Sequence, residues 1–491
     1  MKKNFAKRLG SLLLTLIMVN AMAACGQQQH EDTQPSTAPT NAPTEEMNTP
    51  PTEEDPEPVT LKVAGMPDKD AYPEGYEAFI QQKATFEDMY PWITIEGTTD
   101  GYDVQTFFAK AAAGQLPDYI TAPLTEISKI LNAGYAMDLT EALKENGWLD
   151  MMNETVLQTV SKDGQVYCIP MWPYALGLGA NYSVLEEAGV LNADGTVDWP
   201  ETWEELGEMG GKIKAATGKA GISFPTTGNC GGWHFTSIAW SYGVDFVKQT
   251  EDGKWVANFA NDECAAALQM ISDWKWKYDA LSDDLFLDYG GFTKLWYSAQ
   301  AGFVLANPTE STLRDVVVNY GRDGKDLYFG TVPAGPAGTY ELTGGQIAFM
   351  PSTSDPAKLD AFFKWVSFQG IGPDITEESL NNVEASLKSY VDSGVTVVAK
   401  PPLNTWVSGD GAAAQQALRE KYADPDQSQY ADYCDMTGVI LHPEVEVYCQ
   451  ELYSILDGCV QEVLNNKDAD IPALLEKAAS DYQNNYLNNI E

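Results

Sequence analysis

Four side chains in two predicted loops have the chemistry to hold a polyhydroxylated molecule. Trp172 and Tyr174 stand among prolines and a glycine, where regular packing is not expected, and Asn229 and Trp233 belong to a glycine-rich stretch after a short apolar strand. A sugar offers patches of C–H groups and a ring of hydroxyls, so a site for it needs flat aromatic faces beside amides and carboxylates. We therefore predict that these four residues contact such a ligand, with structural packing as the competing interpretation.

The sequence offers little for metal or acid–base chemistry. Its three histidines, at 30, 234 and 442, lack the spacing of a zinc site, and no local motif isolates a catalytic acid and nucleophile. A calcium site at residues 194–198 is conceivable, but that segment fits a surface turn better. We expect no catalytic residue, no cofactor and no bound metal. The six cysteines after Cys25 contain no C-x-x-C pair, and whether they form disulfides stays open.

Cys25 predicts where the protein is located. Residues 1–24 have a basic start, an apolar centre and small residues at the end, which are the three parts of a signal peptide. The apolar centre is too short to span a bilayer. Met22-Ala23-Ala24-Cys25 resembles a bacterial lipobox, which implies that Cys25 becomes the lipidated first residue of the mature chain. An ordinary cleaved signal is the alternative. The expected location is the extracytoplasmic face of the bacterial cell membrane, with a lipid anchor.

Residues 25–58 are predicted to be a disordered tether. After Cys25 this stretch contains seven prolines and eight acidic residues, no Lys or Arg, and almost no large apolar side chains, so it cannot build a core. From Val59 the chain is globular in composition and long enough for two domains. The whole chain has 30 basic and 71 acidic residues and a formal charge of −41, which disfavours nucleic acid and anionic lipid headgroups as partners.

The start of the globular part alternates between strand and helix patterns. The expected elements are strands at 61–65, 93–97 and 119–122 and helices at 76–89 and 104–113. This alternation is typical of a parallel sheet with crossover helices. Ligands of such sheets bind beyond the carboxyl ends of the strands, which here are the loops 66–74, 98–102 and 123–126.

Eight short motifs follow in order along the globular part. They include Gly114-Gln115-Leu116-Pro117-Asp118, Asp163-Gly164-Gln165-Val166-Tyr167, Trp199-Pro200-Glu201-Thr202-Trp203 and Ser298-Ala299-Gln300-Ala301-Gly302. In this order they resemble the extracellular solute-binding proteins of ABC importers, family 1, of the carbohydrate type. Two departures from the family pattern, near residues 180–183 and 300–304, imply only distant similarity to maltose-binding protein.

The resemblance implies an α/β, two-lobed, periplasmic-binding-protein-like type II fold with discontinuous lobes joined by hinge strands. One lobe would comprise residues 59–172 and 333–395, and the other residues 178–328 and 403–491. The hinge segments would lie at about 172–179, 329–333 and 396–402. The resemblance also implies that the loop at Asn307 and Glu310 faces the cleft between the lobes.

Further candidate ligand contacts lie in other predicted loops, with structural packing again as the alternative. They are Gln346, Trp406, Asp100 and Tyr102.

The resemblance implies a binding protein, not an enzyme. It would be a monomeric lipoprotein that captures a sugar, an oligosaccharide by expectation, between two closing lobes and delivers it to the transmembrane permease subunits of an ABC importer. The membrane would be reached through the lipid anchor alone. Two alternatives stay open: the same receptor role for a peptide, a polyamine or another small solute, and a surface glycoside hydrolase that uses a carboxylate pair.

Overall fold

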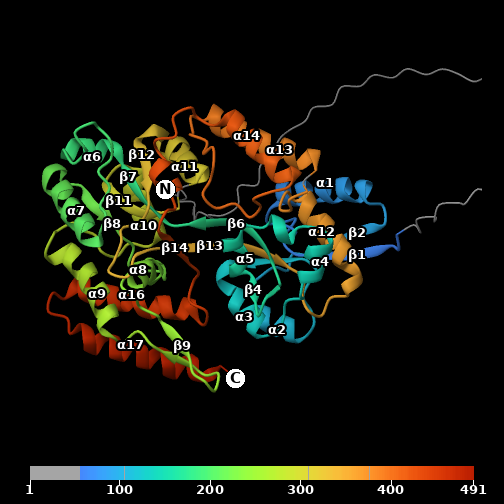
Figure 1. Ribbon diagram of the computed structural model, residues 1–491, viewed down its shortest axis with the longest axis horizontal. Helices are drawn as coiled ribbons and strands as arrows, with labels where there is room; N and C mark the ends of the chain where they lie inside the picture. The colour runs from blue at the N-terminus through green and yellow to red at the C-terminus, as the bar shows by residue number, and fades with distance from the viewer. Residues whose placement is uncertain (1–55, 104–105, 308, 375, 491) are drawn as a thin grey trace, which may run out of the picture.

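The computed structural model describes residues 56–490 except 104–105, 308 and 375, so the leader 1–24, Cys25 and the tether up to residue 55 lie outside the described residues. The chain folds into two lobes (Figure 1). The cluster of the first lobe draws on residues 61–171, 347–371 and Trp406. Two further clusters lie in the second lobe. The predicted α/β class with two discontinuous lobes is confirmed.

The first lobe begins with the predicted alternation of strands and helices. Strands β1 and β2 pair in parallel, and Leu61 and Ile95 are among the side chains they bury. Helix α1 packs beside strand β2. Its Phe79 and Phe86 also lie edge-on against Trp365 of α12, which ties α1 to that helix. Its elements are β1 (Val59–Val63), α1 (Pro73–Met89), β2 (Ile93–Gly97), α2 (Phe107–Ala112), β3 (Ile120–Pro123), α3 (Ile127–Asn132), α4 (Thr140–Glu145), α5 (Glu154–Thr159), β4 (Ser161–Lys162), β5 (Gln165–Val166), β6 (Ile169–Ala175) and α12 (Leu359–Phe368).

The second lobe has a four-stranded sheet in the order β12-β7-β11-β8, with β8 and β11 parallel. Every residue of β7 and β11 is buried, as expected for strands covered by helices on both faces. Its elements are β7 (Gly177–Asn181), α6 (Tyr182–Ala188), α7 (Trp203–Thr217), β8 (Ala220–Ser223), α8 (Cys230–Ser241), β9 (Val247–Gln249), β10 (Trp255–Ala257), α9 (Asp262–Trp276), α10 (Tyr289–Tyr297), β11 (Ala301–Ala306), α11 (Glu310–Tyr320), β12 (Leu327–Gly330), α16 (Cys449–Asn465) and α17 (Ile471–Asn485).

Two long strands carry the chain between the lobes. Within β6 and the start of β7 the chain leaves the first cluster at Met171 and enters the second lobe at Leu176. Strand β13 (Thr339–Phe349) returns, with Leu342 in the second lobe and Ile347 in the first. It pairs with β6, with β3 and with β14 (Val439–His442). Residues 329–333, expected as the second hinge segment, pack inside the second lobe instead.

A helical segment after α12 connects the lobes again, at the top of Figure 1. It contains α13 (Glu377–Asp392), α14 (Asp410–Tyr422) and α15 (Ala431–Cys434). Before α14 the chain is fixed to the second lobe, because the Thr396 hydroxyl donates to Gln429. It then reaches the first lobe, where the Thr405 hydroxyl donates to the carbonyl of Pro170 at 3.1 Å. The stretch between these two anchors spans the lobes.

Three features bear on location and chemistry. Within the described part of the chain, no helix combines the length and apolarity required to cross a bilayer. The same part brings no three His, Cys, Asp or Glu side chains together as metal ligands. The cysteines at 168, 230, 264, 434, 449 and 459 are unbonded thiols in the described residues, and four of them are buried.

Candidate functional site

A cleft of about 990 Å³ lies between the two lobes. Its walls include the crossing strands β6 and β13, the loop from β11 to α11, the stretch 398–409, one face of α14, and Tyr430 and Tyr433. Six of the ten side chains that the sequence singled out line this cleft, namely Trp172, Tyr174, Asn307, Glu310, Gln346 and Trp406. The structure therefore assembles residues up to 234 positions apart in one place.

Trp172 stands in the cleft with 66% of its side chain exposed. A bulge in the β6–β13 pairing puts it there, since Tyr174 faces Gly344 and Met171 faces Gln346, which leaves two residues of β6 opposite Gly345 alone. The backbone of Trp172 has φ +47°, a left-handed conformation that is strained for a bulky residue. Such strain persists only where the surroundings enforce it, and it is typical of functional sites.

Gly345 makes this bulge possible. Its φ is +147°, and a Cβ there would lie 3.0 Å from the carbonyl oxygen of Met171 and 3.2 Å from that of Trp172. No larger residue fits without moving the strand. The close approach of the two backbones at Gly345 therefore holds the strand so that the indole of Trp172 is free for a ligand.

Two buried polar atoms in the cleft lack a hydrogen-bond partner among the described residues. They are Oδ1 of Asn307 and the hydroxyl of Tyr430. The backbone of Asn307 is fixed, because its carbonyl oxygen accepts from the hydroxyl of Thr312 at 2.9 Å. The ring of Tyr430 is stacked on Phe329, with centroids 5.1 Å apart. Buried polar groups almost always find partners, so these two atoms are poised to bond a ligand or ordered water.

Glu310 joins the two sides of the cleft. Its Oε1 accepts from Nη1 of Arg419 on α14 at 2.6 Å and from the backbone N–H of Val398 at 3.2 Å. Glu310 sits in the first turn of α11, capped by Thr309, where the helix dipole favours a negative charge. The carboxylate is therefore largely used in holding α14 against α11.

Gln346, Trp406 and Tyr174 differ in what they can offer a ligand. The side chain of Gln346 is exposed in the cleft. Trp406 is only 9% exposed, and its indole N–H already donates to the carbonyl of Ile371, so it can present a ring edge at most. Burial raises the pKa of Tyr174, whose ring packs against Gly344.

The other four candidates do not line the cleft. The indole N–H of Trp233 donates to Glu444 at 2.7 Å, and Asn229 is held at its backbone N–H by Asp457. Asp100 is paired with Lys110 at 2.9 Å. Tyr102 packs on Phe107 with its hydroxyl buried and without a hydrogen-bond partner among the described residues.

A second contact between the lobes lies where α3 meets the start of α16. Nζ of Lys129 lies 3.3 Å from Oε2 of Glu126 in the first lobe and 5.7 Å from the ring centre of Tyr448, which precedes α16 in the second. Nearby carboxylates, Glu126 foremost, outweigh burial and raise the pKa of Lys129. Close by, burial raises the pKa of Glu444 to about 7, although Trp233 and Tyr453 both donate to it. This contact joins the two lobes in the present structure.

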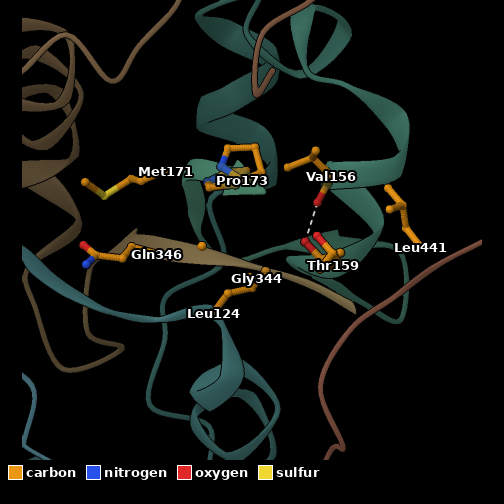
Figure 2. A pocket seen from close by; sticks show the side chains of 11 residues that line it. Leu124, Val156, Thr159, Met171, Pro173, Gly344, Gln346 and Leu441 are labelled. Atoms are coloured by element: carbon orange, nitrogen blue, oxygen red, sulfur yellow. Dashed lines mark hydrogen bonds between the residues drawn. The ribbon is translucent and has the colours of Figure 1, made fainter. Parts of the chain in front are cut away.

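A small void also lies where β6 and β13 cross. Figure 2 shows its lining, in which Met171 and Gln346 extend to one side while Val156, Thr159 and Leu441 lie on the other. Its volume of about 10 Å³ holds one water molecule at most. It is a packing defect of the crossing strands and too small for a solute.

Sequence reasoning missed the cleft wall formed by Lys400, Arg419, Tyr430 and Tyr433. These residues follow the third expected hinge segment or belong to it, in helical and polar sequence with no motif of its own. The proline pair at 401–402 was the available signal, since it marks an extended stretch that runs between the lobes.

Known proteins resemble this chain in sequence and in fold. A family model described as bacterial extracellular solute-binding protein matches residues 69–370. Among solved structures, maltose-bound MalE3 of T. maritima has 19% identity and a TM-score of 0.59, with 86% of this chain and 99% of that chain covered. The cyclic alpha-maltosyl-1,6-maltose binding protein from Arthrobacter globiformis has 21% identity, coverage of 88% and 100%, and a TM-score of 0.59.

A third similar structure binds a different kind of molecule. UgpB from Mycobacterium tuberculosis, in complex with glycerophosphocholine, has 14% identity, coverage of 87% and 97%, and a TM-score of 0.61. At these identities the similarity establishes the fold.

Proposed function

Because the chain belongs to the bacterial extracellular solute-binding proteins, we propose that its cleft captures a sugar and that closure of the lobes holds it for delivery to the permease of an ABC importer. The observation that carries the proposal is Trp172, an exposed and strained indole in a cleft of about 990 Å³. Flat aromatic faces suit the C–H patches of a sugar ring. Asn307 Oδ1 and the Tyr430 hydroxyl are placed to bond its hydroxyls.

The size of the cleft supports an oligosaccharide over a single sugar ring. Pockets for small molecules usually measure roughly 300–1,000 Å³, and this cleft is at the upper end of that range. The similar structures with bound maltose and with a cyclic maltosyl-maltose specificity accord with a ligand of several rings. The proposed contacts are the six side chains in the cleft. Asn229, Trp233, Asp100 and Tyr102 would reach a ligand only after the lobes move.

We also propose that the protein binds its ligand without breaking or forming any bond in it. Hydrolysis of a glycosidic bond uses a pair of carboxylates, and the described lining of the cleft contributes Glu310, whose charge is already paired with Arg419. We further propose that Cys25 anchors the protein by a lipid at the outer face of the membrane, and that residues 26–58 let the two lobes, joined at the crossing strands, stand off the bilayer.

A thermal-shift screen tests the proposal. The purified protein is melted in the presence of a broad glycan panel, a peptide library and a set of polyamines. The proposal expects a shift with a glycan of two or more rings, because a ligand that binds the folded state stabilises it by mass action. A shift with peptides or polyamines and with no glycan would refute the sugar and retain the receptor role. Release of reducing sugar from a glycan that binds would refute capture without chemistry.

A further inference from the structure

The cleft has a charge unlike that of the chain around it. Acidic residues outnumber basic ones 71 to 30 in the whole sequence. Among the described residues that line the cleft, the charged side chains are Lys400, Arg419 and Glu310. A cleft lined by an average sample of this chain would be strongly acidic. In the described lining, basic side chains outnumber acidic ones, the reverse of the whole chain. A cleft concentrates the electric field of the charges that line it.

The one carboxylate of this set is neutralised. Oε1 of Glu310 accepts from Arg419 and from the backbone of Val398. Arg314 lies one turn further along α11, and its Nε is buried without a hydrogen-bond partner among the described residues. Of the three charged side chains in the described lining, two are positive and one is negative, so the lining carries a net positive charge.

Lys400 presents a further positive charge from a fixed backbone. On its N-terminal side, the N–H of Ala399 donates to Gln427 at 2.9 Å and the carbonyl of Ala399 accepts from Gln416 at 3.0 Å. On its C-terminal side, the proline pair 401–402 restricts the chain. Within the described part of the chain, no carboxylate lies in ion-pair distance of its ammonium group, which is exposed in the cleft. The backbone at Lys400 is therefore anchored, and the ammonium group it carries is available to a ligand.

Resting on the proposed function, we propose that the captured solute is an anionic saccharide whose acidic group, a carboxylate, sulfate or phosphate, pairs with the ammonium group of Lys400. A polyamine would meet the surplus positive charge and be repelled. A neutral sugar would leave the ammonium group of Lys400 without a counter-charge. The rest of the saccharide would lie against Trp172 and Asn307, which carry no charge and suit the sugar rings.

A glycan array probed with the full-length protein tests this assignment. Its arms are neutral, carboxylated, sulfated and phosphorylated glycans of matched chain length. Binding confined to one or more of the acidic arms supports the inference and identifies the acidic group. Binding confined to neutral glycans, or equal binding to acidic glycans and their neutral counterparts, overturns the inference while the proposed function stands. An array without any binding overturns both.

Substitution of Lys400 then locates the charge contact. Lys400→Met should bind the acidic glycan found on the array about tenfold more weakly, the usual scale for one charge-assisted hydrogen bond. Lys400→Arg should retain most of the affinity. The control Lys248→Met removes the same charge from exposed strand β9 and should bind like the wild type. Equal affinity of Lys400→Met and wild type would overturn the role of Lys400, provided that both proteins melt at the same temperature.

Discussion

Nη1 of Arg419 donates to Oε1 of Glu310 at 2.6 Å, across 109 positions of sequence. The two side chains are 27% and 12% exposed, so both charges are largely removed from water. Arg419 also donates to the carbonyl of Val398, which ties the stretch before Lys400 to the same pair. This ion pair fixes α14 to α11 and with it the wall of the cleft.

The Glu310–Arg419 pair should show strong coupling. Arg419→Met leaves the carboxylate of Glu310 largely buried and without its ionic partner, and we expect a loss of about 2 kcal/mol in the free energy of unfolding. Adding Glu310→Gln should recover part of that loss, because the buried carboxylate that lacks its partner is then replaced by a neutral amide. Urea unfolding of both single variants and the double variant measures the coupling. The same cycle on the exposed pair Lys144 and Glu141 is the control and should give a value near zero. Additive losses at Glu310 and Arg419 would contradict the structural role given to this pair.

The strained backbone of Trp172 should lower the melting temperature of the wild type relative to a variant that accepts this conformation. Glycine accepts φ +47° at no steric cost, whereas a β-branched residue does not. Trp172→Gly should therefore melt at or above the temperature of the wild type, because an exposed side chain contributes little packing, and Trp172→Val should melt below both. Thermal unfolding monitored by circular dichroism provides the comparison. If Trp172→Gly lost as much stability as a core tryptophan such as Trp274, the indole would be structural and the argument from strain would fail.

The pH dependence of stability should be dominated by buried glutamates at the crossing strands. Burial raises the pKa of Glu341 on β13 to about 8, and its Oε2 lacks a hydrogen-bond partner among the described residues. An unfolded glutamate titrates near pH 4.3, so from about pH 4 to 8 the folded state keeps a proton that the unfolded state has released. The free energy of unfolding must then fall as the pH rises through that window.

Glu341→Gln should remove most of this dependence. The amide is neutral at every pH, so the variant should exceed the wild type at pH 8 by roughly 2–4 kcal/mol and match it near pH 4. A weaker slope of the same sign should remain, because burial raises the pKa of Glu444 to about 7. Urea unfolding at pH 5, 6.5 and 8 measures this, with Glu145→Gln on an exposed position of α4 as the control. Parallel curves for wild type and Glu341→Gln would refute the assignment.

The contact between Lys129 and Tyr448 should favour the arrangement of the lobes that is present in this structure. Lys129→Met removes the ammonium group that lies between Glu126 and the ring of Tyr448. Glu126 is 2% exposed, and without its partner the carboxylate gains by returning to water when the lobes part. Small-angle scattering of the ligand-free protein should give a larger radius of gyration for this variant. The double variant Lys129→Met, Glu126→Gln should have a radius of gyration closer to that of the wild type. The control Lys144→Met should have the same radius of gyration as the wild type. No change in Lys129→Met would show that the contact does not control closure.

Much of the fold could be predicted because its signals are local. The alternation of apolar residues in β1 and β2 and the proline at the start of α1 set those elements to within a few residues. The exposed Trp172 could also be predicted, since prolines flank it and disrupt regular pairing. The passage between the lobes through β13 was harder, because its residues form one continuous strand and the change of lobe depends on which cluster each side chain meets.

Candidate residues that do not line the cleft are held elsewhere by hydrogen bonds to residues distant in sequence. Trp233 is bound by Glu444 and Asn229 by Asp457, at separations of 211 and 228 residues, which no local pattern reveals. Conversely, Arg419 and Tyr430 line the cleft although no local pattern predicted it. Nothing in their local sequence distinguishes them from residues of an ordinary surface helix, and the fold alone brings them into the cleft that Glu310 and Asn307 also line.

The most direct test of capture in this cleft is an equilibrium titration of the glycan that most stabilises the protein, with wild type, Trp172→Ala and Trp255→Ala compared. Trp255 lies on β10 in the second lobe, outside the lining of the cleft, and its replacement removes an indole of the same size. We predict that Trp172→Ala binds at least about tenfold more weakly, the scale of one lost aromatic stacking contact and its buried area. Trp255→Ala should match the wild type. Equal affinities for wild type and Trp172→Ala would contradict binding in this cleft.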